Sequence, residues 1–73
     1  MFKFKIFKEL DKEFATLQMN YENNYRDLAK EETANLSEKI EKLKNEGILT
    51  GKKYEYYKAK IDDYKERMIN YHY

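Results

Sequence analysis

Apolar residues recur in steps of three and four along most of this chain, a spacing that keeps one side of an α-helix apolar. The first run consists of Phe7, Leu10, Phe14, Leu17, Tyr21, Tyr25 and Leu28. Glu9, Asp11 and Glu13 place negative charge near its start, where the dipole of a helix favours it. The pattern therefore predicts a long helix over residues 7–30.

A second run with the same spacing comprises Leu36, Ile40 and Leu43. Its apolar face is rotated by roughly 70° from that of the first run. The segment between the two runs is polar, and within it Asn35 and Glu38 have the spacing of a capping box. We expect a break or bend at residues 31–35 and then a helix over residues 35–46. One continuous helix is the alternative that the sequence leaves open.

The last run follows a heptad spacing and comprises Tyr54, Tyr57, Ile61, Tyr64, Met68 and Tyr71. It predicts a helix over residues 51–71 that lies antiparallel to the helix over residues 35–46. Tyr56 and Tyr73 lie off this seam, and we expect both to be exposed. A tyrosine hydroxyl requires a hydrogen-bond partner or water, so the seam suits an interface as well as a core.

Between the last two helices, the segment GILTGKK contains both glycines of the chain. Only three residues separate these glycines, and Lys53 stands where a phosphate-binding Walker A loop has Ser or Thr, so that motif is excluded. A turn between two helices accounts for the segment instead. Gly47 can take the left-handed conformation that ends a helix, and Ile48 and Leu49 can enter the space between the helices. Thr50 can then cap the next helix, with the second glycine in its first turn.

Residues 40–61, IEKLKNEGILTGKKYEYYKAKI, resemble the SHOCT domain, a short helical hairpin often found at the C-termini of bacterial proteins. The matching positions are Ile40, Leu43, Gly47, Ile48, Leu49, Thr50, Tyr54, Lys58 and Ile61. Lys52 and Lys53 depart from the pattern, because the family usually has Glu there. The resemblance implies a hairpin that serves oligomerisation or protein interaction without catalysis. Residues 1–39 lie outside it.

The N-terminal segment FKFKIF has a different pattern. Phe2, Phe4 and Ile6 alternate with lysines at a period of two, which is typical of a half-buried strand. Helical geometry would instead place Lys3 among the apolar residues. We therefore expect residues 1–6 to form an extended arm that folds onto the chain's own helices or adds to the sheet of a partner.

Composition narrows the classes of function. A chain of 73 residues buries a thin core, and without cysteine neither a disulfide nor a thiolate metal site can supplement it. The formal net charge of +1 attracts neither nucleic acid nor anionic lipid strongly. No apolar run reaches the ~20 residues of a membrane span. We expect a cytoplasmic protein without a metal, a cofactor or another small-molecule ligand.

Together these patterns predict an all-α protein, a single domain over residues 1–73, with a long N-terminal helix and a C-terminal antiparallel helical hairpin. If the long helix continues to residue 46, it is about 60 Å long, and the shorter last helix leaves part of its apolar face uncovered. Such an exposed apolar stripe indicates an interface, so we expect the chain to form a homodimer or to bind a protein partner. We expect it to act as an adaptor or inhibitor, without enzymatic activity. The candidate partner-binding residues are Phe2, Phe4, Ile6, Phe7, Leu10, Phe14, Leu17, Tyr21, Tyr56, Tyr64 and Tyr71.

Nucleic-acid binding is the alternative function. Its candidate residues are Lys52, Lys53, Tyr56 and Lys60, since bases can stack on aromatic rings beside lysines. Acidic residues interleave with these lysines and would repel phosphates. Catalysis has the least support: His72, the single histidine, lies beside the C-terminus, and no nucleophile has a base partner visible in the sequence.

Overall fold

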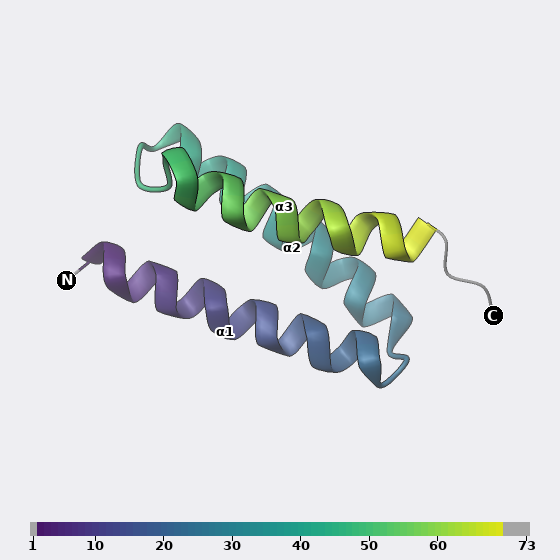
Figure 1. Ribbon diagram of the computed structural model, residues 1–73. Helices are drawn as coiled ribbons and strands as arrows, with labels where there is room; N and C mark the ends of the chain where they lie inside the picture. The colour runs from purple at the N-terminus through teal and green to yellow at the C-terminus, as the bar shows by residue number, and fades with distance from the viewer. Residues whose placement is uncertain (1, 70–73) are drawn as a thin grey trace.

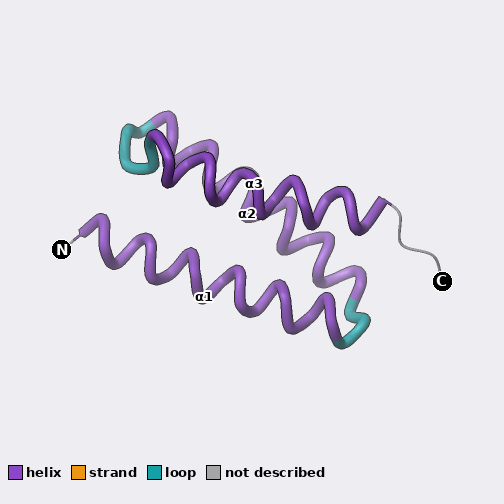
Figure 2. The backbone as a smooth tube through the Cα atoms, in the orientation of Figure 1, coloured by secondary structure: helices purple, strands orange, loops and turns teal. Residues whose placement is uncertain are grey.

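Three helices make up the part of the chain that the computed structural model describes, residues 2–69, with the side chain of Phe2 left out (Figure 1). They are α1 (Phe2–Glu22), α2 (Arg26–Asn45) and α3 (Gly51–Ile69). α1 and α3 run in the same direction, and α2 returns in the opposite direction, passing behind α3 in this view. Two short loops connect the helices (Figure 2), and the described residues contain no strand. The predicted all-α class is confirmed.

The first loop lies earlier than predicted. α1 ends where Asn24 takes a left-handed conformation, with φ of 64°. The backbone N–H of Tyr25 donates to the carbonyl oxygen of Asn20 at 2.9 Å, and that of Asn24 donates to Tyr21 at 3.2 Å. These two bonds satisfy the last carbonyls of the helix in the Schellman arrangement. Asparagine tolerates the left-handed region better than most residues, so the pair Asn23 and Asn24 supplies the local signal for this break.

The predicted break at residues 31–35 is therefore wrong, as are the bounds of helices 7–30 and 35–46 and the capping role of Asn35. α2 runs through this segment, because Ala29 and Thr33 continue the apolar face of its later residues. Both side chains are buried, and the Thr33 hydroxyl donates to the carbonyl oxygen of Ala29 at 2.7 Å. The prediction considered large apolar residues only, so it missed a helix face built from small ones.

The extended arm over residues 1–6 is also wrong for the residues described. α1 begins at Phe2 and includes the whole alternating segment. A lone strand has no partner for its backbone hydrogen bonds, whereas a helix satisfies them internally. Ile6 and Phe7 pack against the core, while Phe4 is 69% exposed.

The position of the second loop and the role of Gly47 agree with the prediction, whereas the Thr50 hydroxyl makes no capping hydrogen bond among the described residues. Gly47 has φ of +76°, and the N–H of Ile48 donates to the carbonyl oxygen of Leu43 at 3.0 Å, again in the Schellman arrangement. Leu49 is fully buried between the helices. Gly51, expected to be an ordinary residue of the first turn, also takes a left-handed φ of +56°. Both glycines are thus required by backbone conformation.

The core lies where all three helices meet. Its buried apolar members are Leu10, Phe14, Leu17, Ala29, Leu36, Ile40, Leu43, Leu49, Tyr57 and Ile61. α1 and α3 each pack closely against α2, but they reach one another through aromatic side chains rather than by close approach of their backbones. The rings of Phe14 and Tyr57 stack with centroids 5.6 Å apart, and those of Tyr21 and Tyr64 meet edge to face at 5.8 Å.

This packing corrects the basis on which a homodimer was expected. The first loop folds α1 back along α2, so Leu10, Phe14 and Leu17 are covered by the chain itself. The heptad seam of α3 faces the same core, with Tyr57 and Ile61 buried and Tyr54, Tyr64 and Met68 partly buried. Tyr71 and Tyr73 lie outside the described residues. Within residues 2–69, no helix has the length and apolar character that crossing a membrane requires.

Replacing Gly47 with alanine tests the conformation of the second loop. No neighbouring atom lies within 4 Å of an added Cβ, so the left-handed backbone alone opposes the substitution. We expect Gly47→Ala to lower the free energy of unfolding by about 1 kcal/mol in urea denaturation followed by circular dichroism. Gly47→Asn, the matched control, should lose less unfolding free energy, because asparagine already occupies the left-handed conformation at position 24. Equal losses for the two variants would contradict this account.

Candidate functional site

A groove opens between α1 and α3 on the side away from α2. It consists of two adjoining hollows that share Asp11 and Lys60. The larger has a volume of about 520 Å³ and is lined by Asp11, Lys52, Lys53, Tyr56, Tyr57 and Lys60. The smaller, of about 300 Å³, is lined by Asp11, Phe14, Ala15, Gln18, Lys60, Asp63 and Tyr64. We call these two hollows together the α1–α3 groove.

Tyr57 forms the floor of the groove. Its side chain is fully buried, and its hydroxyl donates to Oδ1 of Asp11 at 2.8 Å. The carbonyl oxygen of Phe7 lies 3.5 Å from the same hydroxyl. Burial, and then the hydrogen bond to Asp11, raise the pKa of Tyr57 far above its ordinary value of 10.0. The phenol therefore stays protonated at neutral pH and holds the Asp11 carboxylate in one place.

Lysine side chains lie over the aromatic rings at the groove's rim. The Nζ atom of Lys53 lies 5.0 Å from the centroid of the Phe7 ring. Lys60 Nζ lies 4.8 Å from the Tyr56 ring and 5.3 Å from the Phe14 ring. At these distances the ammonium groups are attracted to the faces of the rings. The groove thus combines apolar rings with cations held in front of them.

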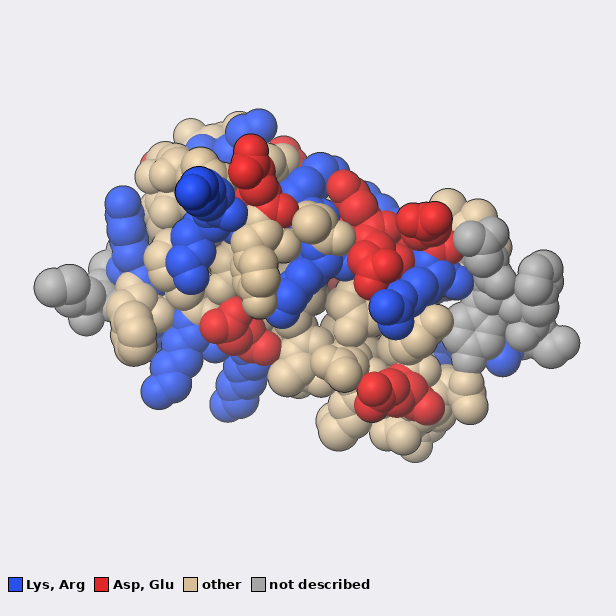
Figure 3. Space-filling model, viewed as in Figure 1, with Lys and Arg blue, Asp and Glu red and all other residues tan. Residues whose placement is uncertain are grey.

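The positive charge of the groove is only partly balanced. Among the described residues, Lys52, Lys53 and Lys60 make no ion pair within 4 Å, whereas Asp63 at the far end pairs with Arg67 at 3.1 Å. That leaves Asp11 as the one unpaired carboxylate against three lysines. Lys52 and Lys53 lie in the first turn of α3, at the end of the molecule where α1 also begins. That turn contains no acidic residue, so the positive end of the α3 dipole adds to the field of the groove. Lysine and arginine side chains predominate at this end of the face in Figure 3.

The structure divides the residues that were predicted to bind a protein partner. Phe4 and Tyr56 are exposed, at 69% and 52%. Leu10, Phe14 and Leu17 are buried in the core, and a further four pack partly buried against it: Ile6, Phe7, Tyr21 and Tyr64. The Phe2 side chain and Tyr71 lie outside the described part of the chain.

All four residues of the nucleic-acid alternative come together, since Lys52, Lys53, Tyr56 and Lys60 line the larger hollow. Asp11 and Tyr57 also belong to this site, and neither was predicted as a site residue. Asp11 follows Phe7 by four residues and precedes Phe14 by three, a spacing that places it at the edge of the apolar face. That spacing was a usable signal, but only the packing of α3 against α1 brings Tyr57 to it.

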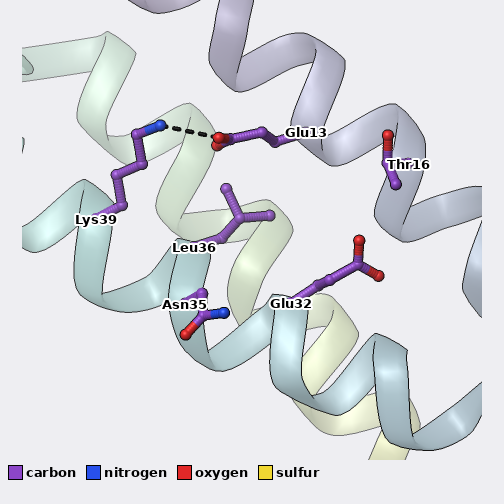
Figure 4. Close-up of a pocket in the computed structure, with 6 residues that line it drawn as sticks. All are labelled: Glu13, Thr16, Glu32, Asn35, Leu36 and Lys39. Carbon is purple, nitrogen blue, oxygen red and sulfur yellow. Dashed lines mark hydrogen bonds and ion pairs between the residues drawn. The ribbon is translucent and has the colours of Figure 1, made fainter.

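A separate hollow, outside the α1–α3 groove, lies between α1 and α2 and has a volume of about 250 Å³ (Figure 4). Lys39 reaches across it, with its Nζ atom 2.9 Å from Oε1 of Glu13. The side-chain amide of Asn20 donates to Glu32 at 2.6 Å. Glu13 and Glu32 thus join α1 to α2 across the hollow, while the second carboxylate oxygen of Glu13, Oε2, is buried without a hydrogen-bond partner among the described residues. No cluster of metal-ligating side chains occurs among the described residues.

Comparison of the chain with models of protein families, with curated proteins and with solved structures found no match. The resemblance of residues 40–61 to the SHOCT domain therefore stays a prediction.

The raised pKa of Tyr57 predicts a loss of stability at alkaline pH. Because the folded protein holds this phenol more tightly protonated than the unfolded chain does, its contribution is complete below pH 10 and is lost as the pH rises above that value. We expect the free energy of unfolding to fall above pH 10, and Tyr57→Phe to reduce that slope by up to about 1.4 kcal/mol per pH unit. Tyr25→Phe, which removes an exposed hydroxyl at the first loop, should keep the wild-type slope. Denaturation at a series of pH values checks this, and identical slopes in all three proteins would show that Tyr57 is not the group responsible.

Proposed function

We propose that this protein is a small helical interaction module without enzymatic activity, which binds a protein partner through the α1–α3 groove. The observation that carries the proposal is the position of Tyr56. Its ring is half exposed in the larger hollow of the groove, next to the buried aromatic floor that Tyr57 forms. Tyrosine is enriched at protein interfaces, because it combines a large apolar surface with a hydroxyl that can bond to the partner.

Tyr56 is also held in position before any partner binds. Its ring meets that of Tyr57 edge to face, with centroids 5.2 Å apart, and Lys60 lies over it. A side chain that is already ordered loses less conformational entropy on binding, so more of the contact energy remains as affinity. This arrangement suits an anchor residue better than a freely rotating surface tyrosine does.

Binding in this groove would let the protein act by covering a segment of its partner. A partner segment that fills the groove is withdrawn from its other contacts, which is how an inhibitor acts, and an adaptor would present the same segment to a third protein. The partner can be another protein or a second copy of this chain. The proposal involves no chemistry: the tyrosines whose pKa values are shifted have them raised, which makes them poorer proton donors near pH 7.

The exposed tyrosine ring of the groove provides the main test. We expect Tyr56→Ala to lower the capture of a host protein in an affinity pull-down by at least about tenfold, since removing a central aromatic anchor costs roughly 2 kcal/mol or more. Tyr25→Ala is the matched control, because Tyr25 is exposed to a similar degree, 56%, at the opposite end of α1. Equal capture by both variants would remove the groove from the proposed function. Sedimentation across a concentration series reports whether the partner is a second copy.

Nucleic-acid binding is a second candidate because its four predicted residues line one hollow. If single-stranded nucleic acid binds there, the affinity for a fluorescent oligonucleotide should fall steeply with salt and be lost in the double variant Lys52→Glu, Lys53→Glu. Lys30→Glu with Lys42→Glu, on exposed positions of α2, carries the same change in net charge and should have a smaller effect. Absence of an anisotropy change at low salt would eliminate this candidate.

A further inference from the structure

We infer that the segment bound in the α1–α3 groove is an amphipathic helix of a second protein, with acidic side chains on the face that enters the groove. This inference rests on the proposed function and adds the chemistry of the partner to it. It follows from the charge of the groove, from its shape, and from the spacing of its acidic residues.

The charge of the groove calls for carboxylates. Three lysines at its rim have no ion-pair partner among the described residues, and two of them, Lys52 and Lys53, lie at the positive dipole end of α3. Grouping like charges in this way destabilises the isolated protein. Acidic side chains of a partner would relieve that repulsion, and opposite charges across an interface also speed association.

The shape of the groove fits a helix. α1 and α3 run in the same direction, and the residues that line the groove all belong to these two helices, so a rod lying along it would contact both. From Lys52 to Tyr64, the groove follows α3 for about 18 Å, the length of a helix of roughly twelve residues. Ala15, a small exposed residue, lines its other side and permits close approach. The bound segment would complete a bundle of four helices around the aromatic floor.

The acidic residues within the groove favour a protein over nucleic acid. Asp11 is fixed by Tyr57 in the middle of the groove, and Asp63 lies at its far end. A nucleic-acid backbone carries a charge at every nucleotide and would pass both carboxylates. A helix can place its acidic residues opposite the lysines alone and apolar or basic residues opposite Asp11 and Asp63. Lys60 also covers one face of the Tyr56 ring, so a base could stack on that face only if the lysine moved away.

Selection from a displayed library of random peptides, fourteen residues long, tests this inference without a known partner. The complete protein is immobilised, and the peptides retained are sequenced. We expect Asp and Glu to be enriched at helical spacing, with apolar residues on the same face. A selected acidic peptide should become helical on binding and bind at least about tenfold more weakly to the triple variant Lys52→Glu, Lys53→Glu, Lys60→Glu.

Matched variants separate the groove from general electrostatic attraction. The triple variant Lys12→Glu, Lys30→Glu, Lys42→Glu changes the net charge equally outside the groove and should keep most of the affinity. The groove variant should in turn select peptides rich in Lys and Arg. If charge reversal unfolds it, as circular dichroism would reveal, the corresponding Lys→Gln variant takes its place and should lose the preference for acidic peptides.

Three results would overturn the inference. They are retained peptides without acidic enrichment, equal weakening by the two triple variants, and tighter binding of a single-stranded oligonucleotide than of any selected peptide. If Tyr56 is still required to capture a host protein, these results would overturn only the inference that the partner segment is an acidic helix, and the proposed function of the groove would stand. If Tyr56→Ala also has no effect on capture, the proposed function fails with it.

Discussion

The contact of Tyr57 with α1 is the interaction on which the arrangement of the three helices depends. α1 and α3 do not approach each other closely through their backbones, so the space between them has to be filled by large side chains. Tyr57 fills it by stacking on Phe14 and by donating its hydroxyl to Asp11. A leucine at this position could supply the apolar contact but not the hydrogen bond that ends the core at a polar surface. The floor of the α1–α3 groove is therefore also the edge of the core.

The two sides of α1 differ in whether their charged groups have partners on the neighbouring helix. Toward α2, Glu13 pairs with Lys39 and Glu32 accepts a hydrogen bond from Asn20, so polar groups join the helices. Toward α3, Lys53 and Lys60 lie over aromatic rings, and no carboxylate of residues 2–69 lies within 4 Å to neutralise them. Charges left without partners add little to the stability of a small domain, and the proposed binding of an acidic partner would explain them.

Features that depend on a few consecutive residues were predicted correctly more often than features that depend on contacts between helices. Gly47 and the aliphatic residues after it mark the second loop, because a left-handed residue and a buried corner are properties of a few consecutive residues. The same chemistry at Asn24 was overlooked, since Tyr25 and Leu28 continue the apolar spacing beyond the point where α1 ends. Lys52, Lys53, Tyr56 and Lys60 were predicted as a possible nucleic-acid-binding set because lysines lie beside a tyrosine within one short stretch of the sequence. Their neighbour Asp11 lies on another helix and was missed.

The sequence by itself determined that this chain is helical, where its second loop lies, and that Tyr57 and Ile61 belong to the apolar seam of the last helix. These properties follow from periodicity and from backbone conformation, which act over a few residues. Only the tertiary structure decided which apolar residues are free. The first loop turns α1 back onto α2, so Phe14 and Leu17 became core and Tyr56 remained exposed. Burial depends on which surfaces the chain brings together, and periodicity along one helix does not contain that information.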